Sequence, residues 1–149
     1  MKRPSIKPFP MNPDTIYVWV GGSCDYGHEE RASAGAYIMQ KDNKTIDTFI
    51  TSDFHTTEFR MILSVMIHAM EILPESSKIV FLTNVAYIQN FAREPGEETA
   101  NSDLIRECIQ LKAKHKEVSV KILPYHKYPK LPETHEMAHE AMQELRKKQ

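Results

Sequence analysis

The chain lacks the features that would mark it as a secreted or membrane-spanning protein. Its two cysteines, Cys24 and Cys108, form no disulfide framework and do not have the spacing of a metal site. No apolar run approaches the roughly 18 residues of a membrane span, and no charged-then-apolar signal opens the sequence. We therefore expect a cytoplasmic protein, in a compartment that keeps thiols reduced.

An excess of charge of either sign is also missing. The formal net charge is −1 and the pI is near 6.7, whereas nucleic-acid-binding domains often have a pI above about 9. The chain as a whole therefore exerts little attraction on phosphates. Nothing in the composition indicates a small-molecule substrate.

What is present is enough for one compact domain. The chain has 149 residues, of which 41% are hydrophobic and 26% charged, and such a chain buries about two-thirds of its unfolded surface in a single core. The first fourteen residues differ, because prolines at this density oppose both helices and strands; they are Pro4, Pro8, Pro10 and Pro13. We expect a proline-rich basic tail over 1–14 and a single domain over 15–149.

Hydrophobic spacing predicts three strands, a helix, a strand, helices, a strand and a final helix. The expected strands are Ile16–Val20, Ser33–Gln40, Thr45–Ser52, Ile79–Leu82 and Val118–Ile122. The expected helices lie between Phe59 and Pro74, near Ala86–Phe91, around Leu104–Ile109 and over Pro132–Lys148, with an acidic loop at Glu94–Thr99.

Four short stretches in this order resemble the catalytic segments of ribonuclease H. They are Val20-Gly21-Gly22-Ser23-Cys24, Thr57-Glu58-Phe59-Arg60-Met61-Ile62, Leu82-Thr83-Asn84-Val85, and His126 followed by His135-Glu136-Met137-Ala138. The family pattern reads Asp-Gly-Ser, Asn-Asn-Arg-Met-Glu, Thr-Asp-Ser, and Gly-His followed by Asp-Glu-Leu-Ala. The resemblance runs from about Thr15 to Lys147. It implies an α/β ribonuclease H-like fold, with a mixed five-stranded sheet (three antiparallel strands, then parallel additions) flanked by helices.

The resemblance also implies where the family's catalytic carboxylates would be, and each of those positions lacks one. The four carboxylate slots are Gly21, Ile62, Asn84 and His135. Cleavage of RNA–DNA hybrids by this family needs carboxylates that grip two hard divalent cations about 3.5–4 Å apart. Glycine and isoleucine offer no side-chain ligand, asparagine offers a neutral one, and histidine suits softer metals. We therefore expect no catalytic residue and no cofactor, although His126 keeps the family's loop histidine.

Each slot residue also has an ordinary structural role. Gly21 can let the backbone turn at a strand end, Ile62 belongs to an apolar helical stripe, and Asn84 can cap the helix expected after it. Displaced acids are the alternative: Asp25, Glu58 and Glu136 lie near the slots in sequence. If these three converged, the chain would be an active, magnesium-dependent hybrid ribonuclease.

A second motif overlaps the fourth slot. His135-Glu136-Met137-Ala138-His139 is a His-Glu-x-x-His sequence, which on a helix can place two imidazoles around zinc. Only ten residues follow His139, so His126 or Glu144 would have to supply the third ligand. The alternative is a polar helical turn at the surface.

Nucleic-acid binding without cleavage is a further possibility. The resemblance implies a phosphate pocket at the start of the long helix, where Thr57 and Arg60 match the family. The family's groove-reading asparagines are replaced there by Glu58 and Phe59, and the loop acids Glu94, Glu97 and Glu98 would repel phosphates.

We conclude from the sequence that the chain resembles a ribonuclease H without its nuclease. The expected function is that of a non-catalytic module that contacts a partner protein, or binds RNA–DNA hybrids or other nucleic acid weakly. Inactive copies of this fold form structural parts of reverse transcriptases and larger nucleoprotein assemblies, and the resemblance implies that option here.

Overall fold

The computed structural model describes residues 9–27, 29–85 and 101–148. Its elements are β1 Ile16–Cys24, β2 Ser33–Lys41, β3 Lys44–Asp53, α1 Glu58–Ile72, β4 Lys78–Thr83, α2 Ser102–Lys112, β5 Glu117–Ile122 and α3 Lys130–Lys147. The expected helix near Ala86–Phe91 and the acidic loop Glu94–Thr99 lie outside the described residues, as do the first eight residues of the tail.

The strands form one five-stranded sheet in the order β3-β2-β1-β4-β5. The pairs β1–β2 and β2–β3 are antiparallel, whereas β1–β4 and β4–β5 are parallel. This confirms the predicted mixed sheet of the ribonuclease H-like fold. The pairing of β1 with β4 covers only Ile16 to Trp19, so the last part of β1 has a strand partner on the β2 side alone.

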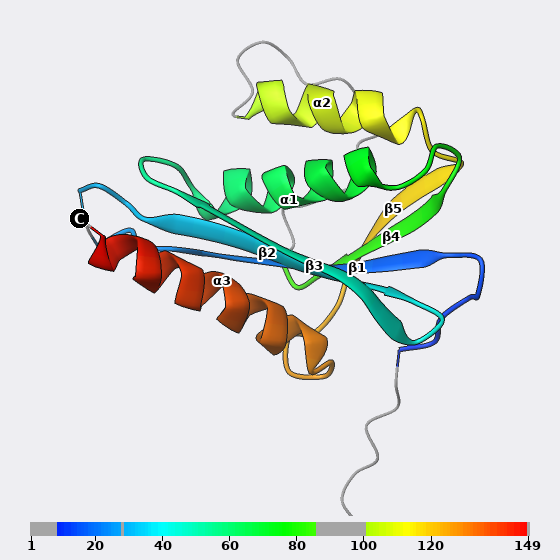
Figure 1. Cartoon of the computed structure of the whole chain (residues 1–149), viewed down its shortest axis with the longest axis horizontal. Coiled ribbons are helices and arrows are strands. Elements are labelled where there is room, and N and C mark those ends of the chain that lie inside the picture. Colours follow the sequence, from blue (N-terminus) through cyan, green and yellow to red (C-terminus); the bar gives the residue numbers. More distant parts are fainter. Residues whose placement is uncertain (1–8, 28, 86–100, 149) are drawn as a thin grey trace, which may run out of the picture.

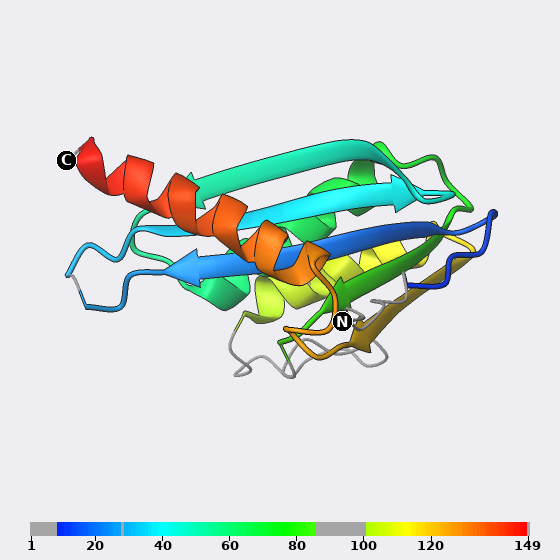
Figure 2. The same cartoon turned by 90° about the horizontal axis from the view of Figure 1, so that it is seen from below.

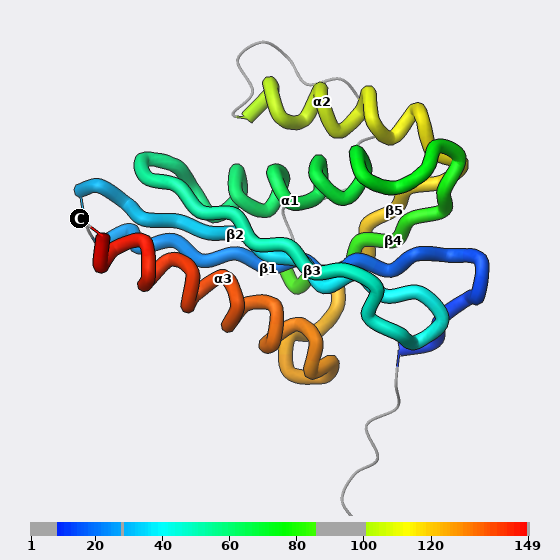
Figure 3. The backbone as a smooth tube through the Cα atoms, viewed as in Figure 1, coloured from blue at the N-terminus to red at the C-terminus, as the bar shows by residue number. Residues whose placement is uncertain are grey.

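Helices cover the two faces of the sheet unequally. Figure 1 shows α1 on one face with α2 stacked outside it, and α3 alone on the opposite face. Figure 2 looks onto that opposite face, where α3 crosses β3, β2 and β1 obliquely and leaves β4 and β5 beside it. Figure 3 traces the path of the chain, with the C-terminal end of α3 next to the loop between β1 and β2.

The apolar residues of β1 alternate between the two cores, because successive side chains of a strand point to opposite faces. Ile16, Val18 and Val20 pack in the core under α1. Tyr17 and Trp19 belong to the core on the α3 side. The stripe of α1 that the sequence predicted is buried, from Met61 to Met70. No helix among the described residues is long and apolar enough to cross a membrane.

The start of α3 and the start of the packed part of the chain both lie earlier in the sequence than expected. Helix α3 begins at Lys130 rather than at Pro132, because a proline in the first helical turn lacks only an N–H that would have no helical partner. The packed part of the chain also begins before Thr15. The ring of Phe9 lies edge-on to Tyr17, Trp19 and Tyr128, with centroid distances of 5.6 to 5.8 Å.

A pair of glycines lets α1 approach the sheet closely. Gly22 of β1 and Gly35 of β2 are cross-strand partners, and both face α1. A Cβ added to Gly35 would lie 2.5 Å from the carbonyl oxygen of Met61, and one added to Gly22 would lie 2.9 Å from Glu58 Cγ and Ile62 Cγ1. The start of α1 therefore rests on strand backbone that carries no side chain.

Gly35→Ala should destabilise the protein, because the new methyl group meets helix backbone that cannot rotate away. We expect a loss of about 1–3 kcal/mol in the free energy of unfolding, as for other overpacked positions. Chemical denaturation measures it. The matched control is Gly27→Ala, whose Cβ would meet only a carboxylate oxygen of Asp25 at 3.5 Å and should change stability by less than about 0.5 kcal/mol. Equal effects in the two variants would contradict the close approach.

Candidate functional site

The first and fourth carboxylate slots lie against each other at the far end of β1. A Cβ added to Gly21 would be 3.1 Å from the backbone nitrogen of His135 and 3.4 Å from its Cα. Gly21 therefore faces the first turns of α3, and the space that a side chain would need is taken by helix backbone. A Cβ at this position would require the backbone of α3 to give by a few tenths of an ångström.

The second slot, Ile62, lies against the opposite face of β1. The neighbour Gly22 faces α1, where Ile62 is fully buried and its Cγ1 closes the space over the glycine. Glu58, one turn earlier on α1, closes the same space with its Cγ. The slot that holds a carboxylate in the family pattern is thus part of the hydrophobic core around α1.

The third slot, Asn84, is exposed directly after β4. In the parallel register of β4 with β1, Leu82 lies beside Trp19. Continuing that register by two residues puts Asn84 level with Gly21, although the pairing has already ended. The predicted role of Asn84 as a helix cap depends on residues outside the described part of the chain.

Two histidines of α3 are held by polar groups of β1. His135 Nδ1 donates a hydrogen bond to the Gly22 carbonyl oxygen at 3.0 Å, and His139 Nδ1 shares one with the Ser23 hydroxyl at 3.3 Å. The two imidazoles lie nearly parallel, with centroids 6.2 Å apart. Neither Nδ1 atom is therefore free to bind a metal.

The third predicted zinc ligand, His126, lies on the exposed loop before α3, where its ring meets the edge of Tyr125 at 5.0 Å. Tyr125 in turn meets His135 at 6.1 Å. The three imidazoles are thus linked through Tyr125 and hydrogen bonds rather than gathered around one point. Zinc binding by this motif stays a prediction.

Glu58 is an acidic group whose pKa is raised by its surroundings. It is half-buried, and that burial raises the pKa of its carboxyl above the ordinary value of 4.5, while the nearby charge of His135 opposes the rise. Its backbone N–H donates to the Tyr26 hydroxyl at 3.4 Å. Glu58 therefore sits between α1, β1 and α3 with one imidazole as its electrostatic neighbour.

The other displaced acids do not join it. Asp25 forms an ion pair with Arg146 at the end of α3, with an oxygen–nitrogen distance of 2.8 Å. Its second carboxylate oxygen accepts a hydrogen bond from the Gly27 N–H at 3.3 Å. Glu136 is exposed on α3. The three acids thus have separate surroundings: Asp25 pairs with Arg146, Glu58 is half-buried near His135, and Glu136 is exposed.

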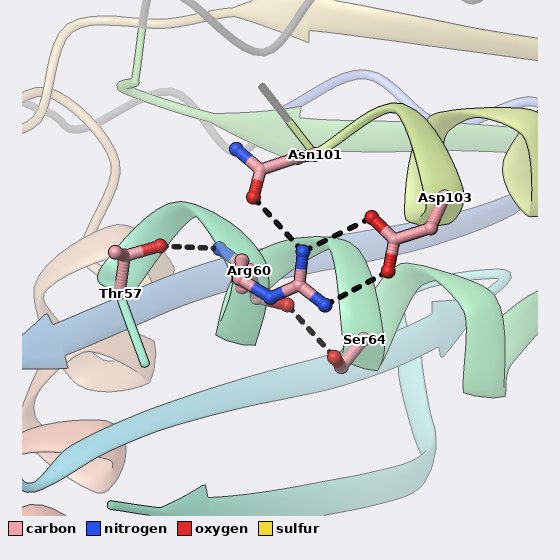
Figure 4. A network of polar contacts seen from close by, with 5 residues as sticks. All are labelled: Thr57, Arg60, Ser64, Asn101 and Asp103. Atoms are coloured by element: carbon pink, nitrogen blue, oxygen red, sulfur yellow. Dashed lines mark hydrogen bonds and ion pairs between the residues drawn. The ribbon is translucent and has the colours of Figure 1, made fainter. Parts of the chain in front are cut away.

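The predicted phosphate-binding residues lie together, but Arg60 is already paired. Thr57 is the N-cap of α1, and its hydroxyl accepts from the Arg60 N–H at 3.2 Å. The Arg60 guanidinium binds Asp103 with two hydrogen bonds, at 2.9 and 3.1 Å, and Asn101 with a third at 3.1 Å (Figure 4). This ion pair lowers the pKa of Asp103 to about 2.

No sequence pattern indicated these pairings. Arg60 and Asp103 are 43 positions apart, and Ser23 and His139 are separated by 116. The only available signals were local: Ser23 alternates with Gly22 and so faces α3, and His139 follows His135 by about one helical turn.

The side chains at the slots do not match the ligand preferences of two hard divalent cations. Gly21 and Ile62 contribute no donor, and His135 uses one nitrogen on a backbone carbonyl. Within the described ranges, no three histidine, cysteine, aspartate or glutamate side chains are grouped so that they could hold a metal ion. The residues present therefore do not fit the two-metal centre that the fold family implies.

Comparison with solved structures agrees with the fold. Ribonuclease H1 from the halophilic archaeon Halobacterium salinarum NRC-1 superposes with a TM-score of 0.63 at 11% identity, covering 85% of this chain and 98% of that protein. LC11-RNase H1, solved in complex with an RNA/DNA hybrid, gives 0.65 at 12% identity, covering 83% of this chain and 96% of that one. No protein-family model and no curated protein matches the sequence. The chain has a ribonuclease H-like fold.

Glu58→Gln should stabilise the protein more at neutral pH than at acidic pH. A carboxyl whose pKa is raised by folding binds more protons in the native state, so native stability falls as the pH rises from about 4.5 through the raised value. The glutamine variant lacks this loss. The difference in free energy of unfolding between variant and parent should therefore grow in favour of the variant across that interval.

Urea denaturation at a series of pH values measures this difference. Glu71→Gln, an exposed residue of the same helix, is the control for the loss of one carboxylate. A Glu58 carboxyl that titrates below 4.5 when followed by NMR would contradict the burial that we describe.

Proposed function

We propose that this chain is a non-catalytic ribonuclease H-like module. The observation that carries the proposal is the packing at the slots: Ile62 is fully buried in the core under α1, and the backbone of α3 lies close over Gly21. A two-metal site needs that volume for carboxylates and ions.

The ligand class that we propose first is nucleic acid, bound weakly. The ribonuclease H-like fold supports this class, and LC11-RNase H1, which shares the fold, was solved with an RNA/DNA hybrid. The net charge of −1 and the pairing of Arg60 with Asp103 limit the electrostatic attraction for phosphates. We therefore expect an affinity that falls steeply with salt.

A partner protein is the second ligand class, and one observation favours it. Strand β3 is an edge of the sheet, and it exposes Ile46 and Ile50 to solvent by 51% and 45%. Edge strands with exposed apolar side chains are places where another chain can add by backbone pairing.

The alternative is an active hybrid ribonuclease in which Asp25, Glu58 and Glu136 bind magnesium. The ion pair of Asp25 with Arg146 and the exposure of Glu136 count against this alternative, because three ligands must converge within a few tenths of an ångström.

The protein should not cleave an RNA–DNA hybrid. Labelled hybrid is incubated with excess protein in magnesium or manganese, with an active ribonuclease H as the positive control, and the products are separated by gel. We expect no product above the buffer blank. Cleavage that follows the protein through purification and stops with chelator would refute the proposal, and its loss in Glu58→Gln would then support relocated ligands.

Asp103→Asn should release Arg60 and strengthen binding to hybrid. One additional phosphate contact steepens the dependence of log affinity on log salt by about 0.9, which fluorescence anisotropy with a labelled hybrid can measure. Asp42→Asn, an exposed turn residue, makes the same charge change elsewhere. Equal affinities for the two variants would mean that the start of α1 is no phosphate site.

A further inference from the structure

The sheet face beside α3 is covered by aromatic side chains instead of a helix. Helix α3 crosses β1, β2 and β3, and β4 lies beyond it (Figure 2). The core on this side contains the buried Tyr17 and Trp19, and partly exposed residues close it, among them Phe9, Tyr125 and Tyr128. Three aromatic residues are thus only partly buried at the edge of this core.

Lysines accompany these rings. The Lys121 ammonium lies 5.8 Å from the centre of the Phe9 ring, and the Lys127 ammonium lies 5.8 Å from the centre of the Tyr128 ring. Both lysines are exposed, and neither forms an ion pair within the described residues. The acidic residue in the first turn of α3, Glu133, is already paired with Lys130 at 2.9 Å.

The rings continue toward the former catalytic slots. Tyr125 meets the exposed His126 at 5.0 Å and His135 at 6.1 Å, and His135 stacks over His139. We call Phe9, Lys121, Tyr125, His126, Lys127 and Tyr128 the lysine–aromatic surface. It combines aromatic rings with two lysines that form no ion pair among the residues described, although the chain as a whole is nearly neutral.

We propose that the lysine–aromatic surface binds single-stranded nucleic acid. Proteins that hold single strands place bases on aromatic rings and phosphates on neighbouring cations, and a duplex cannot offer its stacked bases in this way. Charge complementarity selects a polyanion, and the accessible rings select unpaired bases over an acidic peptide. This inference rests on the proposed function, since it names the form of nucleic acid and the place where it binds.

The test is fluorescence anisotropy of the full chain with a labelled single strand of about 12 nucleotides, compared with a duplex of the same sequence. The variant Lys121→Gln/Lys127→Gln should lower the slope of log affinity against log salt by about 1.4, or about 0.7 for each lost contact. Lys44→Gln/Lys114→Gln removes the same charge from exposed sites elsewhere and should leave the slope unchanged. Tyr125→Leu keeps an apolar side chain and should weaken binding by about fivefold or more.

Three single results would each overturn the inference, and a fourth combination of results would do so as well. The three single results are the absence of single-strand binding at about 50 mM salt, equal or tighter binding of the duplex, and equal losses in the two lysine variants. The inference would also be overturned if polyglutamate displaced the single strand and Tyr125→Leu had no effect. The surface would then bind any polyanion by charge alone. Thermal melting of each variant checks that the fold is retained. If single-strand binding is not found, the proposal that the protein does not hydrolyse hybrids is unaffected. Cleavage of a hybrid would refute the proposed function but would not bear on this surface.

Discussion

The contact of α1 with the bare backbone of β1 and β2 is the constraint on which the site depends. Gly22 and Gly35 sit side by side in the sheet, and their missing side chains let the first turns of α1 descend onto the strands. That descent brings Ile62 and Glu58 over β1 and leaves Arg60 directed toward the start of α2 (Figure 4). A bulkier residue at either glycine would clash with α1 and would move Glu58, Met61 and Ile62 away from the strands.

Polar contacts hold the end of β1 against α3. The pairing of β1 with β4 stops at Trp19, and beyond it the Gly22 carbonyl accepts from His135 while the Ser23 hydroxyl bonds His139. A hydrogen bond of this kind contributes about 1 kcal/mol. The half-buried Glu58 has a cost in the opposite direction, because its ionised form is partly desolvated.

The order of the strands and helices could be predicted because it follows from the spacing of apolar residues. The first strand formed over the apolar run Ile16–Val20, and the stripe of α1 is buried where the periodicity placed it. The polar pairings could not be predicted, because Arg60–Asp103 and Asp25–Arg146 join residues whose separation in the chain carries no periodic signal. The early packing of Phe9 was missed because prolines dominate the segment around it.

His135 connects the closed slot with the lysine–aromatic surface. At the position where the family pattern has an aspartate, the imidazole supplies a donor to Gly22 on one side and a ring that meets Tyr125 on the other. The same imidazole also extends the row of rings toward His139. In the function that we propose, His135 therefore adjoins both features, because it offers no carboxylate at the slot and its ring meets Tyr125 of the lysine–aromatic surface.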